Sequence, residues 1–114
     1  MSRLIRMAAV SAAVAVAAGA FGAHGASGRP AEWLRTGAEY QMVHAVAVLA
    51  VSAMARARTA AILLLAGSAL FAGTLYLMAL GGPLWLGAVT PIGGIGMIVG
   101  WMTLAIRARV ADPQ

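Results

Sequence analysis

Cysteine and lysine are both absent from the 114 residues, and only three residues are acidic. Without cysteine the chain has no disulfide framework, no thiolate nucleophile and no cysteine-based zinc site. The few carboxylates leave no pair for general acid–base catalysis. The serines have no His–Asp pair near them in the expected topology, so a nucleophilic triad is also excluded. We therefore do not expect an enzyme.

Charge of either sign is scarce, and apolar residues take its place. Only 10% of the residues are charged, whereas 62% are hydrophobic. A soluble domain this short has too much surface to tolerate that balance. A protein surrounded by lipid has no such constraint, because its outside can be as apolar as its inside. The composition predicts a single integral membrane domain that covers residues 1–114.

The net charge of +5 comes entirely from arginine. A basic chain raises nucleic acid as a partner. Here the arginines stand in pairs between apolar runs and form no continuous basic face, which is the pattern of membrane topology. We exclude nucleic acid and expect the lipid bilayer as the surroundings of the chain.

Three long uncharged runs give the number of membrane crossings. They have 17 residues between Arg6 and His24, 16 between Glu39 and Arg56, and 48 between Arg58 and Arg107. One crossing needs about 20 residues, so the last run must fold back, and "GGPLWLG" at 81–87 is the natural place. The prediction is an all-α membrane protein, a bundle of four transmembrane helices near residues 4–24, 36–55, 59–80 and 85–106. "PAEWLRTG", which begins at Pro30, is expected to form a short interfacial turn before the second helix.

The distribution of arginine predicts the orientation. After four crossings, Arg29 and Arg35 lie on one side, offset by Glu32 and Glu39, and the other six arginines lie on the opposite side: Arg3, Arg6, Arg56, Arg58, Arg107 and Arg109. The positive-inside rule places both termini in the cytoplasm, as in a multi-pass protein of the bacterial plasma (inner) membrane. A cleaved secretory signal ending near "AGA" at 18–20 is the alternative, and the length of the apolar run favours an uncleaved helix.

Polar side chains gather in the outer half of all four expected helices. This candidate polar cluster consists of His24, Tyr40, Gln41, His44, Tyr76 and Thr90. One interpretation is interhelical hydrogen bonding. The other is a proton-responsive or ligand site, because histidine titrates near neutral pH. A metal site is not expected, since two histidines without HxxxH spacing are a thin ligand set, and no cofactor is indicated.

Small residues at four-residue spacing indicate close helix packing. Gly19 stands between Ala15 and Ala23 in the first helix, and Gly73 follows Ala69 in the third. In the fourth, Gly100 follows Gly96, and Gly93 and Gly94 belong to the same motif, "TPIGGIGMIVG". Pro91 lacks a backbone donor and is expected to kink the fourth helix near its outer end.

Four motifs occur together: "GAFGAHG", "WLRTGAEYQMVHA", "LFAGTLYLMAL" and "TPIGGIGMIVGW". In this order they resemble the family known as domain of unknown function 423, whose members are small bacterial inner-membrane proteins with relatives in eukaryotes. The third motif departs from the family pattern, which has serine at the positions of Ala72 and Thr74. The resemblance implies four spans and an uncleaved N-terminus. It implies no activity, cofactor or catalytic residue.

Two functions remain open. The first is a structural or accessory membrane component that packs against a second copy of itself or a larger membrane protein. The second is an oligomeric proton-coupled transporter of small molecules, in which the outer polar cluster around His44 takes the role of a membrane-embedded carboxylate.

Overall fold

The computed structural model describes residues 2–107, and throughout them the regular secondary structure is helical. Four long helices are present: α1 (Ser2–His24), α2 (Gly28–Val51), α3 (Arg58–Ala79) and α4 (Thr90–Arg107). A short 3₁₀ helix, η1 (Leu84–Ala88), precedes α4.

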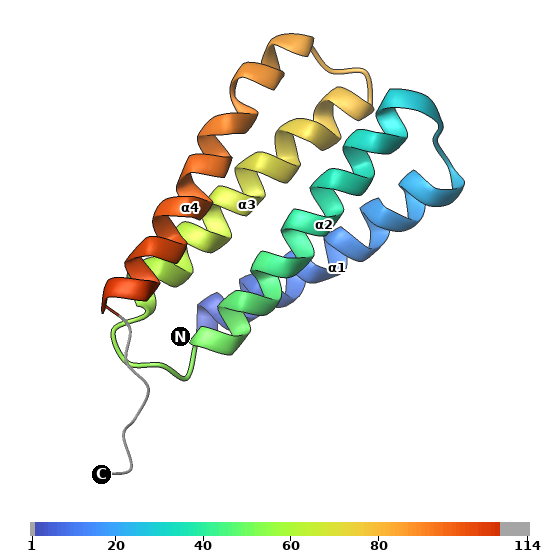
Figure 1. Ribbon diagram of the computed structural model, residues 1–114. Coiled ribbons are helices and arrows are strands. Elements are labelled where there is room, and N and C mark those ends of the chain that lie inside the picture. The colour runs from blue at the N-terminus through green and yellow to red at the C-terminus, as the bar shows by residue number, and fades with distance from the viewer. Residues whose placement is uncertain (1, 108–114) are drawn as a thin grey trace.

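The helices run up and down, each antiparallel to the next, and lie in chain order (Figure 1). α2 packs against α1 and α3, and α3 packs against α2 and α4. Within residues 2–107, α1 and α4 do not contact each other, so the bundle is open rather than closed into a ring. The start of α1, the α2–α3 connection and the end of α4 share one end, which we call the arginine end.

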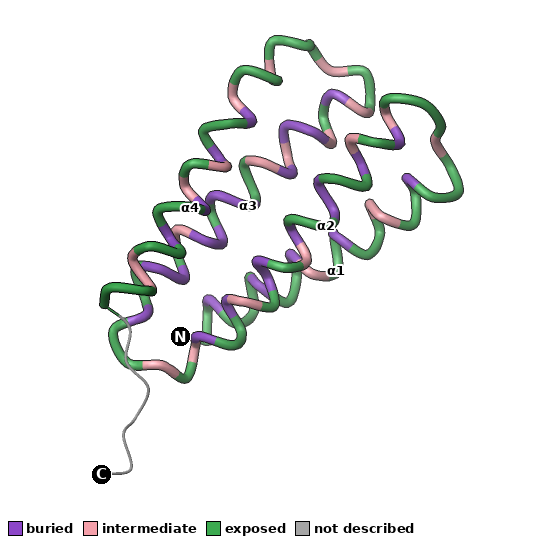
Figure 2. Tube along the Cα trace, viewed as in Figure 1, coloured by how far each residue is buried: buried purple, intermediate pink, exposed green. Residues whose placement is uncertain are grey.

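Burial follows this arrangement (Figure 2). The buried residues of α1 recur at spacings of three and four, which gives one narrow stripe facing one neighbour: Leu4, Ala8, Ser11, Ala15 and Gly22. α3 has buried positions on more than one side, because it lies between α2 and α4. The outward sides of α1 and α4 expose large apolar side chains such as Val16 and Ile95.

The second helix begins earlier than its sequence pattern suggested. α2 starts at Gly28 and continues without interruption to Val51, so "PAEWLRTG" forms its first turns and not a separate interfacial turn. Pro30 is accommodated there because the first-turn amides have no intrahelical partner.

The turn expected at the two glycines is present. Gly81 has a φ of +97°, and the Gly82 amide donates to the Leu77 carbonyl over 2.7 Å. The Gly81 amide donates to the Met78 carbonyl, which completes a Schellman cap that satisfies the last carbonyls of α3. The chain then forms η1, and α4 begins only at Thr90. Pro91 therefore lies in the first turn of α4, where it costs no helical hydrogen bond, rather than inside a longer helix that it would kink.

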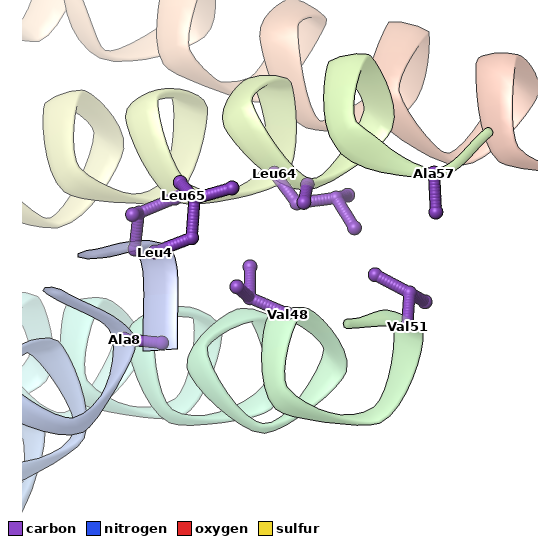
Figure 3. Packing of buried hydrophobic residues seen from close by; sticks show 8 residues of the cluster. Leu4, Ala8, Val48, Val51, Ala57, Leu64 and Leu65 are labelled. Carbon is purple, nitrogen blue, oxygen red and sulfur yellow. The ribbon is translucent and has the colours of Figure 1, made fainter. Parts of the chain in front are cut away.

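An apolar core occupies the arginine end (Figure 3). It joins α1, α2 and α3 through Leu4, Ala8, Val48, Val51, Ala57, Ala61, Leu64 and Leu65. The polar side chains of the interior lie farther along the helices, away from this core.

Three helical segments are long and apolar enough to cross a membrane: α1, α3 and Leu84–Arg107, which joins η1 to α4. α2 is as long, but its first half carries Arg29, Glu32, Arg35 and Glu39. The described chain is thus an all-helical protein with three membrane-compatible helices.

Candidate functional site

One chain of hydrogen bonds connects α1, α2 and α3. The Gln41 side chain donates from Nε2 to Ser11 Oγ over 3.0 Å, and the Tyr76 hydroxyl donates to Gln41 Oε1 over 2.6 Å. The Gln41 amide thus uses both its donor and its acceptor to join three helices. Gln41 and Ser11 are buried, so these bonds satisfy groups that would be costly to leave unpaired in an apolar interior.

A glycine in α2 makes room for the Tyr76 ring. A Cβ built on Gly37 would lie 2.6 Å from Tyr76 Cε1, closer than any real side-chain contact. Gly37 and Gln41 are four residues apart and share one face of α2. The ring therefore lies over Gly37, and its hydroxyl reaches Gln41 one turn farther along.

His44 connects α2 to α4. The Trp101 indole donates from Nε1 to His44 Nε2 over 3.0 Å, and His44 Nδ1 lies 2.7 Å from the Tyr40 carbonyl oxygen. An indole N–H can only donate and a carbonyl oxygen can only accept. These two partners specify a neutral imidazole with its proton on Nδ1.

Aromatic rings surround His44. The Tyr40 ring is stacked with the imidazole at a centroid distance of 6.2 Å, and Trp101 meets it edge-on at 5.7 Å. The Phe71 ring lies 4.7 Å from Tyr40. A cavity of about 310 Å³ opens among these four side chains and the facing side of α4.

A third set of polar groups connects α3 to the start of α4. The hydroxyls of Thr74 and Thr90 are 2.6 Å apart, and they also lie within hydrogen-bond distance of the carbonyls of Phe71 and Leu86 respectively. This pair secures the beginning of α4 against α3.

The structure separates the six residues of the candidate polar cluster into groups. Gln41 bonds to Tyr76 and Ser11, and Thr90 bonds to Thr74. Tyr40 contacts His44, which in turn accepts from Trp101. His24 lies apart from all of them, exposed at the last turn of α1.

Sequence reasoning missed two of the partners. Ser11 is not part of the candidate polar cluster, although its place in the stripe Ala8, Ser11, Ala15 marks it as facing α2. Trp101 follows Gly94 by seven residues and shares its helix face. That spacing is the feature of the sequence that could have identified Trp101 as a candidate site residue.

Glycines bring the backbones of α3 and α4 together. A Cβ on Gly93 would lie 2.5 Å from the Phe71 amide nitrogen, and one on Gly67 would lie 2.8 Å from the Met97 amide nitrogen. Gly96 packs on Gly67, and Gly100 packs on Leu64. On α3, the glycine that lets α4 approach closely is therefore Gly67.

The remaining glycines of the packing prediction make looser contacts. A Cβ on Gly73 would meet nothing within 4 Å. A Cβ on Gly94 would lie 4.0 Å from the Phe71 ring, and one on Gly19 would lie 3.5 Å from the Ala38 Cβ.

The interior is chemically saturated. Across residues 2–107 no buried side-chain nitrogen or oxygen lacks a hydrogen-bond partner. In the same part of the chain no three His, Cys, Asp or Glu side chains lie close enough to hold a metal ion. What the arrangement can do chemically is to fix the helices relative to one another.

An all-helical chain with several membrane-compatible helices and polar groups paired across them is a small multi-pass membrane protein. A family model described as "Protein of unknown function (DUF423)" matches residues 18–94, and the chain belongs to this family.

Relatives carry names of the same kind. The chain is 42% identical over 78 residues to a "UPF0382 membrane protein" of Haemophilus influenzae, covering 64% of this chain and 63% of the relative. It is 37% identical over 80 residues to "UPF0382 membrane protein YwdK" of Bacillus subtilis, covering 64% and 65%. It is 34% identical over 82 residues to "UPF0382 inner membrane protein YgdD" of Escherichia coli, covering 67% and 63%. No solved structure matches.

The chain spans a little under two thirds of the length of these relatives. Their names give no activity. The chain is accordingly a multi-pass inner-membrane protein from a family of uncharacterised membrane proteins.

Proposed function

We propose that the protein is a structural or accessory component of the membrane and not an enzyme or a carrier. The observation that supports this is the use of the polar groups. Gln41 and Tyr76 bond to side chains of other helices, and His44 accepts from Trp101 of α4 while its second ring nitrogen lies against the Tyr40 carbonyl of its own helix. Polar residues placed this way hold together a bundle that lipid does not drive to associate.

We further propose that α2 is a fourth crossing. α2 lies between α1 and α3 and packs on both. Two helices that cross the bilayer carry a third, packed between them, through the same layer. The charged first half of α2 then reaches the aqueous boundary, where Arg29, Glu32, Arg35 and Glu39 are hydrated.

The orientation proposed has both termini in the cytoplasm. The arginine end carries Arg3, Arg6, Arg56, Arg58 and Arg107 without an acidic residue among them, within the part of the chain that the structure describes. The opposite end balances Arg29 and Arg35 with Glu32 and Glu39. Only the first end has the arginine excess that marks the cytoplasmic side.

Partners are proposed to bind the outward sides of α1 and α4. These sides expose large apolar residues, among them Ile5, Val16, Ile95 and Met102. In a membrane such sides meet lipid, a second copy of the chain or a larger membrane protein.

Reconstitution of the purified full chain into vesicles separates this proposal from the transporter alternative. A pH-sensitive dye inside the vesicles reports proton entry under an imposed gradient. We expect the same rate as in protein-free vesicles, because both ring nitrogens of His44 are engaged. A rate increase that His44→Ala abolishes, and that His24→Ala at the exposed end of α1 leaves unchanged, would overturn the proposal in favour of transport.

A further inference from the structure

A long apolar groove runs between α1 and α3, starting at the arginine end. It consists of two adjoining cavities of about 340 and 430 Å³. They share three lining residues, Met7, Leu65 and Ala69, and are therefore parts of one groove.

The groove follows from the packing of α1. The stripe of Leu4, Ala8, Ser11 and Ala15 directs α1 toward α2, and α1 touches α3 at only a few positions. On the α3 side the wall includes alanine at 66 and 69, whose short side chains leave the space between the helices unfilled.

Positive charge surrounds the open end of the groove. Arg3 and Arg58 line the first cavity, and Arg6 lines the second. The two carboxylates among residues 2–107, Glu32 and Glu39, lie in the first half of α2 at the opposite end of the molecule. No acidic side chain of the described chain therefore offsets these three arginines.

The depth of the groove matches one leaflet of a bilayer. Its lining on α1 extends from Arg3 to Val14. Eleven residues of helix rise about 16 Å, roughly half of a hydrocarbon core that is about 30 Å thick. Both walls belong to membrane-compatible helices, so the apolar part lies at the depth of acyl chains and the arginines lie at the level of the headgroups.

We propose that this groove is a binding site for an anionic membrane phospholipid. One acyl chain lies along Met7, Val10 and Val14 of α1 and Leu65 and Ala69 of α3, and the phosphate lies among Arg3, Arg6 and Arg58. Basic pockets between transmembrane helices bind acidic headgroups in this way. The Ser11 and Gln41 side chains, which are bonded to each other, line the second cavity, whereas His44 lines neither cavity. The inference holds whether or not the protein is an accessory component.

Native mass spectrometry of the full chain tests the proposal. The protein is released from mixed micelles that hold equal amounts of phosphatidylglycerol and phosphatidylcholine of the same chain length, and the lipid that stays bound is counted. We expect phosphatidylglycerol to be retained preferentially. Each Arg→Gln change at positions 3, 6 and 58 is expected to lower the preference about fivefold, the change that corresponds to about 1 kcal/mol per basic side chain at an anionic surface.

Two matched controls localise the site. Arg29→Gln with Arg35→Gln removes charge from the opposite end and is expected to leave the preference unchanged. Ala69→Leu fills the groove and is expected to reduce retention of phosphatidylglycerol, whereas Gly73→Leu, one turn farther along α3 and in open space, is expected not to. The Ala69→Leu comparison remains decisive if the arginine variants fail to insert.

Three results would overturn the proposal. The first is equal retention of the two lipids by the natural chain. The second is an equal loss of preference on removing arginines from either end, which shows diffuse charge and no site. The third is full retention of phosphatidylglycerol by folded Ala69→Leu.

Discussion

Tyr76 and Gln41 are joined by a single hydrogen bond across α2 and α3, and the Tyr76 hydroxyl contributes little else. Tyr76→Phe removes this donor and leaves Gln41 Oε1 without it. Interhelical hydrogen bonds in membranes contribute about 0.6 kcal/mol on average and about 1.7 kcal/mol at most. We expect a loss of unfolding free energy in that range, measured by denaturation of the purified protein in micelles.

Tyr40→Phe is the matched control for Tyr76→Phe. It deletes the same atom from the same residue type, but Tyr40 is an exposed side chain. We expect its unfolding free energy to be that of the natural chain. Equal losses in the two variants would show that the bond to Gln41 contributes nothing specific.

His44 is expected to be a neutral imidazole with its proton on Nδ1. Its neighbours require this, since the Tyr40 carbonyl accepts and the Trp101 indole donates. Nitrogen-15 NMR of histidine-labelled protein distinguishes the two tautomers. The chain has two histidines, and the exposed His24 supplies the internal reference for a solvated ring.

Trp101→Phe removes the indole donor and so identifies which nitrogen-15 signal belongs to His44. We expect the His44 Nε2 resonance to move while that of His24 stays in place. A proton found on Nε2 of His44 in the natural chain would contradict the hydrogen bond from Trp101.

At the scale of the elements, two glycines that look alike in the sequence have opposite roles. Gly93→Ala puts a methyl group 2.5 Å from the Phe71 amide nitrogen and 2.7 Å from the Gly67 carbonyl oxygen. Backbone cannot give way there, so α3 and α4 must separate. We expect a destabilisation of about 1–3 kcal/mol, the usual cost of overpacking.

Gly73→Ala is the matched change on α3, where a Cβ would meet nothing within 4 Å. Glycine inside a helix is less favourable than alanine by roughly 0.5–1 kcal/mol. The substitution is therefore expected to stabilise the protein, and the same denaturation measurement gives both values. A Gly93→Ala variant as stable as the natural chain would contradict the close α3–α4 approach, and a destabilised Gly73→Ala variant would contradict the open space at Gly73.

Helix boundaries could be predicted where the end of an apolar run and a glycine turn coincide with them. The range expected near 59–80 lies within one residue of α3 at each end, because the apolar run begins directly after Arg58 and the pair Gly81 and Gly82 ends the helix. The second helix was expected near 36–55 and instead covers Gly28–Val51. Charges and Pro30 suggested a boundary, but packing on both neighbours keeps the helix continuous through them.

At the scale of the whole molecule, the proposed topology predicts which connections face the periplasm. The natural chain has no cysteine, so single cysteines report their own position. Ser27→Cys and Leu84→Cys, between α1 and α2 and at the start of η1, are expected to react with a membrane-impermeant maleimide in intact cells. Ser2→Cys and Ala55→Cys, at the arginine end, are expected to react only after permeabilisation.

Other labelling patterns would identify the competing topologies. If α2 did not cross, cysteines at positions 27 and 55 would react on the same side. If the first helix were a cleaved signal, the Ser2→Cys label would be absent from the mature protein, and its mass would be lower by that segment. Either pattern would overturn four crossings with both termini inside.

The amino-acid sequence by itself determined that this is a helical membrane protein, because long uncharged runs and a lack of acidic residues are properties of composition and order that no packing can change. It also marked Gln41 and His44 as costly in an apolar interior. Only the tertiary structure decided their partners, Ser11 and Tyr76 for one and Trp101 for the other. Spacing along one helix says which of its residues share a face. The rotation and depth of the neighbouring helix decide which side chain of that neighbour meets this face. The same rotation leaves His24 outside and opens the groove between α1 and α3.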